Sequence, residues 1–342
     1  MDRSILRTLT AAAAALCAAM LSFAPARAQN AADQSVATGP APVIRIQARS
    51  ADVTIRTWNR PTVEIVSSAP FRAMHFGPQA VQRAFPGGDV TVFETQIQTV
   101  NGTVRLPQED FPVDGIAGSP HDGVAIFGGD SNATMTITAP ASSALVLAVI
   151  GRGGIHVSGY HGAMVTQLHN GAIDVTGSSG QAYVETARGT ISVTNSGFDR
   201  IRARTAIGNV FFSGCTVRQI EVNAVRGHIT YDNGTFSPGL ARFETQQGNI
   251  ALGIASGGVQ VGAHSNTGRI VSEFNRNVGS QQDAQAVVNG GGPVVTANAG
   301  NGTVYIYSGS FKNKPANRQR LAAPRVYKTP KVKTCAVRRC LP

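Results

Sequence analysis

The chain has 342 residues, of which 42% are hydrophobic, 6% aromatic and 14% charged, and it contains 38 glycines. This length is ample for one large core, and so much glycine with so little charge favours short strands and tight turns over helical or disordered structure. The net charge of +11 is uneven, because residues 311–342 hold ten Lys and Arg and no acidic residue, whereas 29–310 is nearly balanced. The positive charge therefore belongs to a C-terminal tail and not to the folded body.

The first 28 residues have the three parts of a secretory signal peptide. Arg3 and Arg7 precede a mostly apolar run over 8–23, and the triplet A-R-A ending at Ala28 is a small-residue cleavage site. We expect export to the periplasm or the cell surface and no transmembrane span after cleavage, since no other apolar run is long enough. Residues 29–42 are expected to form a linker.

Pairs of apolar residues at i and i+2, the period of a strand, begin near residue 43. Ile44 and Ile46 are followed nine residues later by Val53 and Ile55, and the pair Thr95/Ile97 precedes Val104/Leu106 by the same offset. We predict that 43–150 is the irregular N-terminal part of a β-solenoid. It is expected to be interrupted by insertions over 67–89 and 107–123, the first of which is rich in aromatic residues and suited to capping the open end of the core.

A phrase of one glycine followed by a strand recurs through 151–308 and predicts regular solenoid coils. Successive phrase glycines are 17 to 21 residues apart, except for a final interval of 34 that we assign to an insertion over 275–292. A period near 19 with two apolar pairs per repeat predicts an all-β fold, a parallel two-sheet β-solenoid with a thin core. The phrase glycines are Gly154, Gly171, Gly189, Gly208, Gly227, Gly248, Gly268 and Gly302.

Three stretches together carry a resemblance to a known family. They are VIRIQARSADVTI from Val43, TMTITAPASSALVLAVIGRGGIHV from Thr134, and the serial G-x-I-x-V coils. Over roughly 43–308 the chain resembles the putative-adhesin family of exported bacterial β-solenoid proteins, in which a strand ending in a proline, here Pro140, leads into the regular coils. The resemblance implies a surface role and brings no catalytic residue with it.

One row of outward positions on the second strand of each coil stands out. Tyr183, Arg202, Glu221 and Arg242 are spaced so that they would stack on consecutive coils. Opposite charges on adjacent strands stabilise a sheet by about 0.2–1 kcal/mol per pair, so a structural ladder is one interpretation. The other is a strip that binds a glycan or another partner.

The motifs of catalysis and metal binding are absent from the sequence. No nucleophile elbow, phosphate-binding loop or helical His-Glu-x-x-His occurs, and the histidines lack metal-ligand spacing. We therefore expect no catalytic residue, cofactor or metal, and a non-enzymatic module that serves adhesion, scaffolding or envelope binding. The alternative is a polysaccharide-active lyase or hydrolase built on a β-helix.

The tail over 309–342 suggests partners. Its basic residues would bind an anionic envelope polymer or polysaccharide by counterion release, and nucleic acid is not expected for an exported protein. Cys335 and Cys340 could close a disulfide after export, whereas Cys215 is expected to be a core residue. Unpaired strand edges at the ends of the solenoid would permit self-association. The basic residues of the tail are Lys312, Lys314, Arg318, Arg320, Arg325, Lys328, Lys331, Lys333, Arg338 and Arg339.

Overall fold

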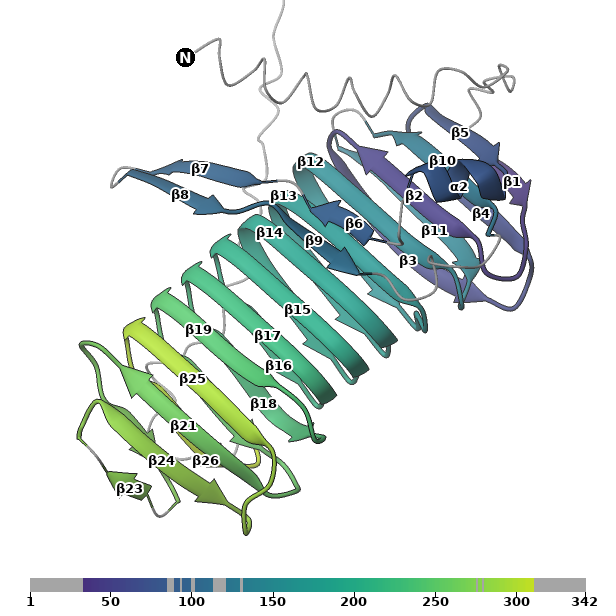
Figure 1. Cartoon of the computed structure of the whole chain (residues 1–342). Coiled ribbons are helices and arrows are strands. Elements are labelled where there is room, and N and C mark those ends of the chain that lie inside the picture. The colour runs from purple at the N-terminus through teal and green to yellow at the C-terminus, as the bar shows by residue number, and fades with distance from the viewer. Residues whose placement is uncertain are drawn as a thin grey trace, which may run out of the picture.

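The computed structural model shows an elongated molecule built almost entirely of β-strands (Figure 1). Its strands form one 22-stranded sheet and two small two-stranded sheets, so the all-β prediction is confirmed. The expected signal peptide and the ten basic residues of the tail lie outside the described residues. The described residues are 33–84, 89–92, 94–99, 102–112, 121–129, 132–274, 276–278 and 280–310.

The middle of the molecule is a stack of parallel coils, each with two strand segments joined at a glycine corner. In β13 (Ala163–Thr176) and β14 (Ser179–Thr194), Met164 faces Ala182 before the corner and Ile173 faces Ile191 after it. We call the segments before the corner the front sheet and those after it the back sheet. Pairing at an offset of one repeat is the register expected of a β-solenoid. The stack continues through β15 (Gly197–Ile207), β16 (Val210–Ser213), β17 (Thr216–Arg226), β18 (Ile229–Phe236), β19 (Ala241–Gln247) and β20 (Ile250–Ile254).

The core is a narrow apolar layer between the two sheets. Within one coil Val184 points inward from the front sheet, and Ile191 and Val193 point inward from the back sheet, all fully buried. A single hydrophobic cluster of this kind runs from Ile44 to Ile306. Each such side chain contributes about 1.5–3 kcal/mol when buried, which explains why the i, i+2 pattern repeats in every coil.

At the C-terminal end the coils are not stacked in sequence order. β19 pairs in parallel with β25 (Val294–Asn301), and β21 (Val259–Ser265) lies on the far side of β25. β20 likewise pairs with β26 (Val304–Ser308), which separates it from β22 (Ile270–Ser272). The order of stacking therefore departs from the order in sequence, because the coil of β25 and β26 inserts between two earlier ones.

An antiparallel cap closes this end. β24 (Asp283–Val288) runs antiparallel to β21, and β23 (Arg276–Val278) runs antiparallel to β24. Both strands lie within 275–292, the segment expected to be an insertion. The antiparallel strands pair the outer edge of β21, which would otherwise offer a parallel edge to another chain.

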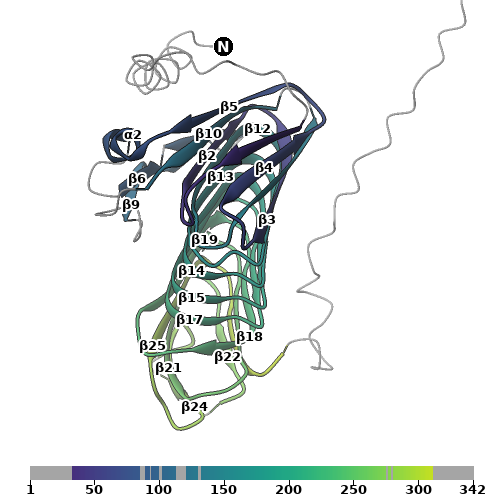
Figure 2. The same ribbon diagram turned by 90° about the vertical axis from the view of Figure 1, so that its right-hand side faces the viewer.

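The N-terminal end is arranged in a similar way, with its parallel coils out of sequence order and an antiparallel cap outside them (Figures 1 and 2). The coil of β2 (Val43–Ala48) and β3 (Ala51–Trp58) lies between β12 (Ala144–Ser158) and the coil of β10 and β11. β4 and β5 form the antiparallel cap at this end. β1, which lies within the segment 29–42 expected to be a linker, pairs antiparallel with β4. The remaining bounds are β1 (Asp33–Ala37), β4 (Thr62–Ser67), β5 (Phe71–Phe76), β10 (Gly123–Gly128) and β11 (Ala133–Pro140).

Between β5 and β10 the chain leaves the stack and lies over the outer face of the front sheet. The short helix α2 (Pro78–Ala84) leads to β6 (Asp89–Val92), which pairs antiparallel with β9 (Glu109–Pro112). We call α2 and these two strands, with the hairpin between them, the flap. Ala163 and Val165 on the outer face of β13 pack in one cluster with Val90, Val92 and Phe111 of the flap.

The hairpin within the flap corrects one prediction. Thr95–Thr99 (β7) and Gly102–Leu106 (β8) were expected to be a coil, but they pair antiparallel with each other in a separate two-stranded sheet. Gly102 has a φ of 110° at the turn, a conformation that glycine adopts readily and that reverses the chain at once. The apolar residues of this hairpin are buried all the same, because Ile97, Val104 and Leu106 pack on the side of the stack.

Candidate functional site

The four residues of the predicted strip are aligned on neighbouring strands of the front sheet. Tyr183 is opposite Arg202, Arg202 is opposite Glu221, and Glu221 is opposite Arg242. Arg202 Nη2 lies 2.7 Å from Glu221 Oε2, whereas Arg242 Nη2 lies 2.6 Å from Glu244 Oε1 on its own strand. The four residues are aligned as predicted, but among them only Arg202 and Glu221 form an ion pair between strands.

Tyr183 is not available to a ligand. The flap covers it, the ring of Phe111 meets its ring edge-on with centroids 5.4 Å apart, and the side chain is 0% exposed. The interpretation of Tyr183 as part of a glycan-binding surface is therefore wrong. One feature of the sequence could have indicated this burial. Val90, Val92 and Phe111 are apolar side chains that become buried only by packing against another surface.

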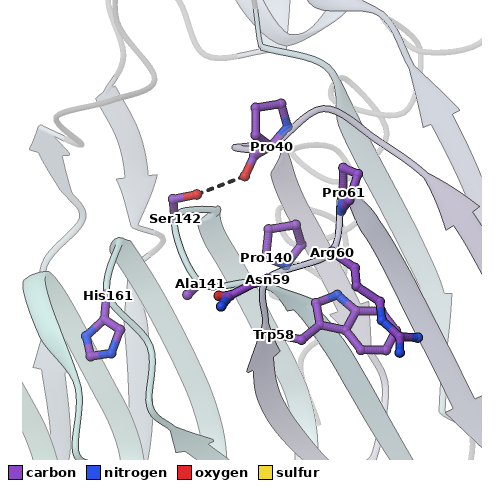
Figure 3. A pocket seen from close by; sticks show the side chains of 9 residues that line it. All are labelled: Pro40, Trp58, Asn59, Arg60, Pro61, Pro140, Ala141, Ser142 and His161. Carbon is purple, nitrogen blue, oxygen red and sulfur yellow. Dashed lines mark hydrogen bonds between the residues drawn. The ribbon is translucent and has the colours of Figure 1, made fainter.

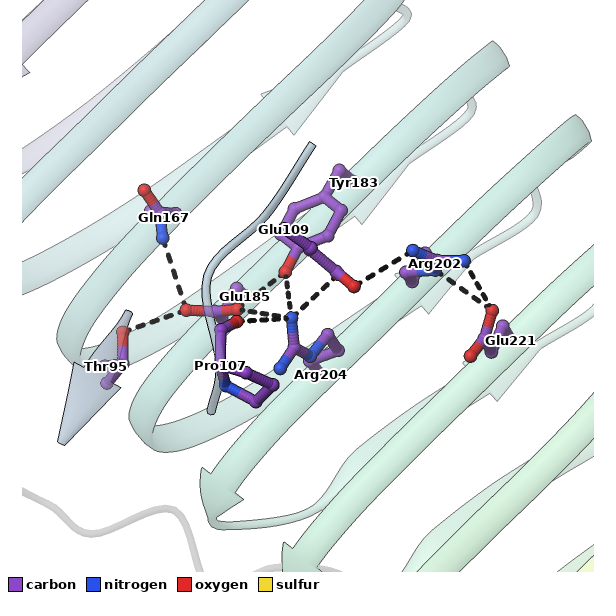
Figure 4. A network of polar contacts seen from close by, with 9 residues as sticks. All are labelled: Thr95, Pro107, Glu109, Gln167, Tyr183, Glu185, Arg202, Arg204 and Glu221. Carbon is purple, nitrogen blue, oxygen red and sulfur yellow. Dashed lines mark hydrogen bonds and ion pairs between the residues drawn. The ribbon is translucent and has the colours of Figure 1, made fainter. Parts of the chain in front are cut away.

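Beneath the flap, Tyr183 belongs to a buried polar network centred on Glu185 (Figure 4). Glu185 is 1% exposed and accepts a hydrogen bond from the Tyr183 hydroxyl at 2.6 Å. Thr95 Oγ1 of the flap and Gln167 Nε2 of β13 also donate to this carboxylate, at 2.9 and 3.2 Å. The carboxylate is thus satisfied from both its own sheet and the flap.

Arg204 supplies the positive charge of the network. Its Nη1 atom donates to the Tyr183 hydroxyl at 2.9 Å and to the carbonyl oxygen of Pro107 at 3.3 Å. The same atom lies 2.7 Å from Glu109 Oε1 and 3.6 Å from Glu185 Oε2. Glu109 reaches Arg202 Nη1 with its other oxygen at 3.1 Å, so one flap carboxylate joins two arginines of β15.

The electrostatics of this network indicate that it holds the flap onto the front sheet. Burial raises the pKa of Glu185 and, more strongly, that of Tyr183, which keeps the phenol neutral. Removing one partner of a buried ion pair typically costs about 3–5 kcal/mol, because the remaining charge stays buried. Glu185, Tyr183 and Arg204 are each at most 6% exposed, so the cluster holds the flap to the sheet and offers no open surface.

A second site, which the sequence analysis missed, is a hollow of about 480 Å³ at the N-terminal end of the stack (Figure 3). Segments far apart in sequence form it: the end of β3 with the following turn, the end of β11, and the corner after β12. Its volume is in the range of small-molecule sites. The lining residues are Pro40, Trp58, Asn59, Arg60, Pro61, Pro140, Ala141, Ser142 and His161.

The hollow combines apolar walls with positive charge. The indole of Trp58 donates from Nε1 to the carbonyl oxygen of Thr62 at 2.9 Å, which sets its orientation. The guanidinium carbon of Arg60 lies 5.2 Å from the centroid of that indole, a cation–π contact. Ser142 Oγ donates to the carbonyl oxygen of Pro40 at 2.8 Å. Since no lining residue is acidic, the hollow favours a neutral or anionic ligand.

Within the described ranges, three histidines each pair with a single acidic residue on the surface, and two of these pairs lie near the N-terminal half of the stack. His75 meets Asp122 at 3.1 Å and His156 meets Asp174 at 3.1 Å, the latter between adjacent coils of the back sheet. Among the residues that the structure describes, no three His, Cys, Asp or Glu side chains are close enough to hold a metal ion.

The cysteines have separate outcomes. Cys215 is buried in the core cluster, as predicted, and burial raises the pKa of its thiol. Cys335 and Cys340, with the ten basic residues of the tail, lie outside the described residues, so their disulfide stays a prediction.

Comparisons with known proteins add little. No protein-family model matches the chain, and no curated protein matches it. Among solved structures, a putative cell adhesion protein from Clostridium sporogenes aligns over 82% of this chain and 100% of its own, with 10% identity and a TM-score of 0.19. At that TM-score the likeness supports no inference, and the family resemblance stays a prediction. In the part of the chain that the structure describes, no helix is long and apolar enough to cross a membrane.

Proposed function

We propose that this protein is an exported, non-enzymatic scaffold with an adhesin-like role at the cell envelope. The coil stack would act as a rigid body, and the basic tail would bind an anionic envelope polymer. The observation that carries the proposal is the uneven distribution of positive charge along the chain. Basic and acidic residues nearly balance over 29–310, whereas 311–342 contain ten basic residues and no acidic one.

Charge pairing within the body supports this division. Several arginines of the front sheet are neutralised by neighbours, so these arginines contribute little to attraction of a polyanion. The tail has no acidic residue with which to do the same. Binding of a polyanion to such a segment would be driven by counterion release and weakened by salt. The paired arginines are Arg202 with Glu109 and Glu221, Arg204 with Glu109 and Glu185, and Arg242 with Glu244.

The architecture suits a scaffold. One continuous core cluster spans the coils, and antiparallel strands cover both ends of the stack. The most deeply buried polar network fastens the flap instead of facing an open cleft. A rod of this kind holds a tail or a binding surface at a fixed distance from the opposite end.

Sedimentation with isolated cell envelopes tests the proposal. Three proteins beginning at residue 29 are compared: the native chain, a variant with all ten tail cations replaced by Gln, and a variant with a scrambled tail of unchanged composition. We expect the native and scrambled chains to sediment at low salt and to be released by high salt, and the Gln variant to remain in solution.

The scrambled tail separates charge from sequence, because an electrostatic anchor requires only the cations. Equal sedimentation of the Gln variant would show that the tail is not the anchor and would overturn its proposed role. Release of the native chain by salt would also exclude trapping of aggregated protein as the cause of sedimentation.

A further inference from the structure

The hollow at Trp58 has features that packing alone does not require. Trp58 is the only tryptophan of the chain, and it sits at the end of β3, partly exposed, instead of in the core. Its Nε1–H is already satisfied by Thr62, so the ring is held in one orientation. A partly exposed aromatic side chain with a fixed orientation is typical of a binding surface.

Arg60 places a cation at the same point. It stacks on the indole of Trp58, and among the described residues no carboxylate forms an ion pair with it. A guanidinium that stacks through its plane still presents N–H donors at its rim, in the fork geometry that matches a carboxylate. The stacked arginine is therefore a preorganised hydrogen-bond donor for an acidic group.

The remaining lining side chains suit hydroxyl groups beside apolar surface. Asn59 and Ser142 are exposed polar residues at the rim, and His161 presents a ring whose Nδ1 atom lies 2.8 Å from Ser179 Oγ. Pro61 and Pro140 add apolar surface to the lining of the hollow (Figure 3). A pyranose ring offers the same combination, with C–H groups on its faces and hydroxyl groups around its edge.

We propose that this hollow binds an acidic sugar residue of the uronic-acid type within an anionic polysaccharide. Arg60 would hold the carboxylate, Trp58 and the prolines would contact the C–H faces, and Asn59 and Ser142 would meet hydroxyl groups. The inference deepens the proposed function by naming a ligand class for the body, and it does not depend on the tail.

The single tryptophan makes the test direct, because fluorescence excited selectively at tryptophan, and not at the six tyrosines, reports on this hollow. The chain beginning at residue 29 is titrated with tetragalacturonate and with cellotetraose, a neutral oligosaccharide of equal length, at moderate salt. The variant with ten tail cations replaced by Gln is titrated in parallel. We expect a saturable change with tetragalacturonate in both proteins and at least tenfold weaker binding of cellotetraose.

Two substitutions on neighbouring positions sharpen the result. Arg60→Gln should weaken tetragalacturonate binding at least tenfold, while Arg56→Gln, an exposed arginine of β3 outside the hollow, should leave it unchanged. Circular dichroism checks that both variants are folded. The proposal is overturned if tetragalacturonate leaves the fluorescence unchanged, if Arg60→Gln binds as tightly as the native chain, or if both oligosaccharides bind equally. A fluorescence response that persists when envelope sedimentation fails would reject the tail's role and retain the site.

Discussion

Five successive corner glycines, from Gly171 to Gly248, are required by the neighbouring backbone as well as by their own dihedral angles. Gly208 has a φ of 151°, and a Cβ atom there would lie 1.6 Å from the carbonyl oxygen of Gly189. A Cβ atom on Gly227 would lie at the same distance from the carbonyl oxygen of Gly208. These corners therefore stack backbone on backbone, and this explains why a glycine recurs at them.

Gly208→Ala should destabilise the protein by about 2–4 kcal/mol, because the Cβ atom forces the corner apart in a conformation already unfavourable for alanine. Gly197→Ala is the matched control, since it has no atom within 4 Å of its Cβ position and no positive φ. Thermal unfolding of both variants checks the expectation, with the control within about 0.5 kcal/mol of the native chain. Equal stability of the two variants would contradict the stacking argument.

At the level of elements, the chain covers the exposed edges and faces that its coils create. The flap covers apolar side chains on the outer face of β12 and β13, and antiparallel strands pair the outer edges of the end coils. One cap has a polar bridge across it: His264 Nδ1 of β21 lies 2.6 Å from Asp283 Oδ1 of β24, its partner in register. We expect this bridge to make the C-terminal cap sensitive to pH.

The hydrogen bond with Asp283 raises the pKa of His264, and the same bond lowers the pKa of Asp283. The contribution of His264 is complete below its unfolded pKa, near 6.5, and is lost as pH rises through the higher folded value. The contribution of Asp283 is present above its unfolded pKa, near 3.8, and is lost as pH falls through the lower folded value. We expect the cap to be most stable between these limits.

Hydrogen exchange of the β24 amides, corrected for intrinsic rates, checks this expectation at pH 5.5 and 8.5. Protection should decrease at the higher pH in the native chain and stay constant in His264→Gln, which cannot be protonated. The same decrease in both proteins would show that another group controls the cap.

For the whole molecule, both ends place one coil out of sequence order behind an antiparallel cap. At the C-terminus, β25 and β26 connect the coil of β19 and β20 to the outer coil of β21 and β22. The last strands of the chain are therefore internal to the stack and support the cap that precedes them. A sequential solenoid could lose its final coil at little cost, whereas this one could not.

A chain ending at residue 293 should lose the order of 255–290 because the outer coil and its cap have no partner. A chain ending at 310 retains every described strand and should keep that order. Limited proteolysis with mass spectrometry distinguishes them, with early cleavage expected between 255 and 290 only in the shorter chain. Protection of that region in both chains would mean that the outer coil stacks directly on β19 and β20.

The repeating unit can be predicted from the amino-acid sequence: paired inward aliphatics, a glycine corner, a period near 19 and the alignment of Arg202, Glu221 and Arg242. These features are local and recur in every coil, so their periodicity reveals them. Three other features follow only from the folded structure: the order of the end coils, the burial of Tyr183 and the hollow that joins Trp58 to His161. These three features depend on contacts between segments that are distant in sequence and share no repeat period. A side chain becomes buried when some other segment covers the apolar face on which it lies, and the sequence does not show which segment does so.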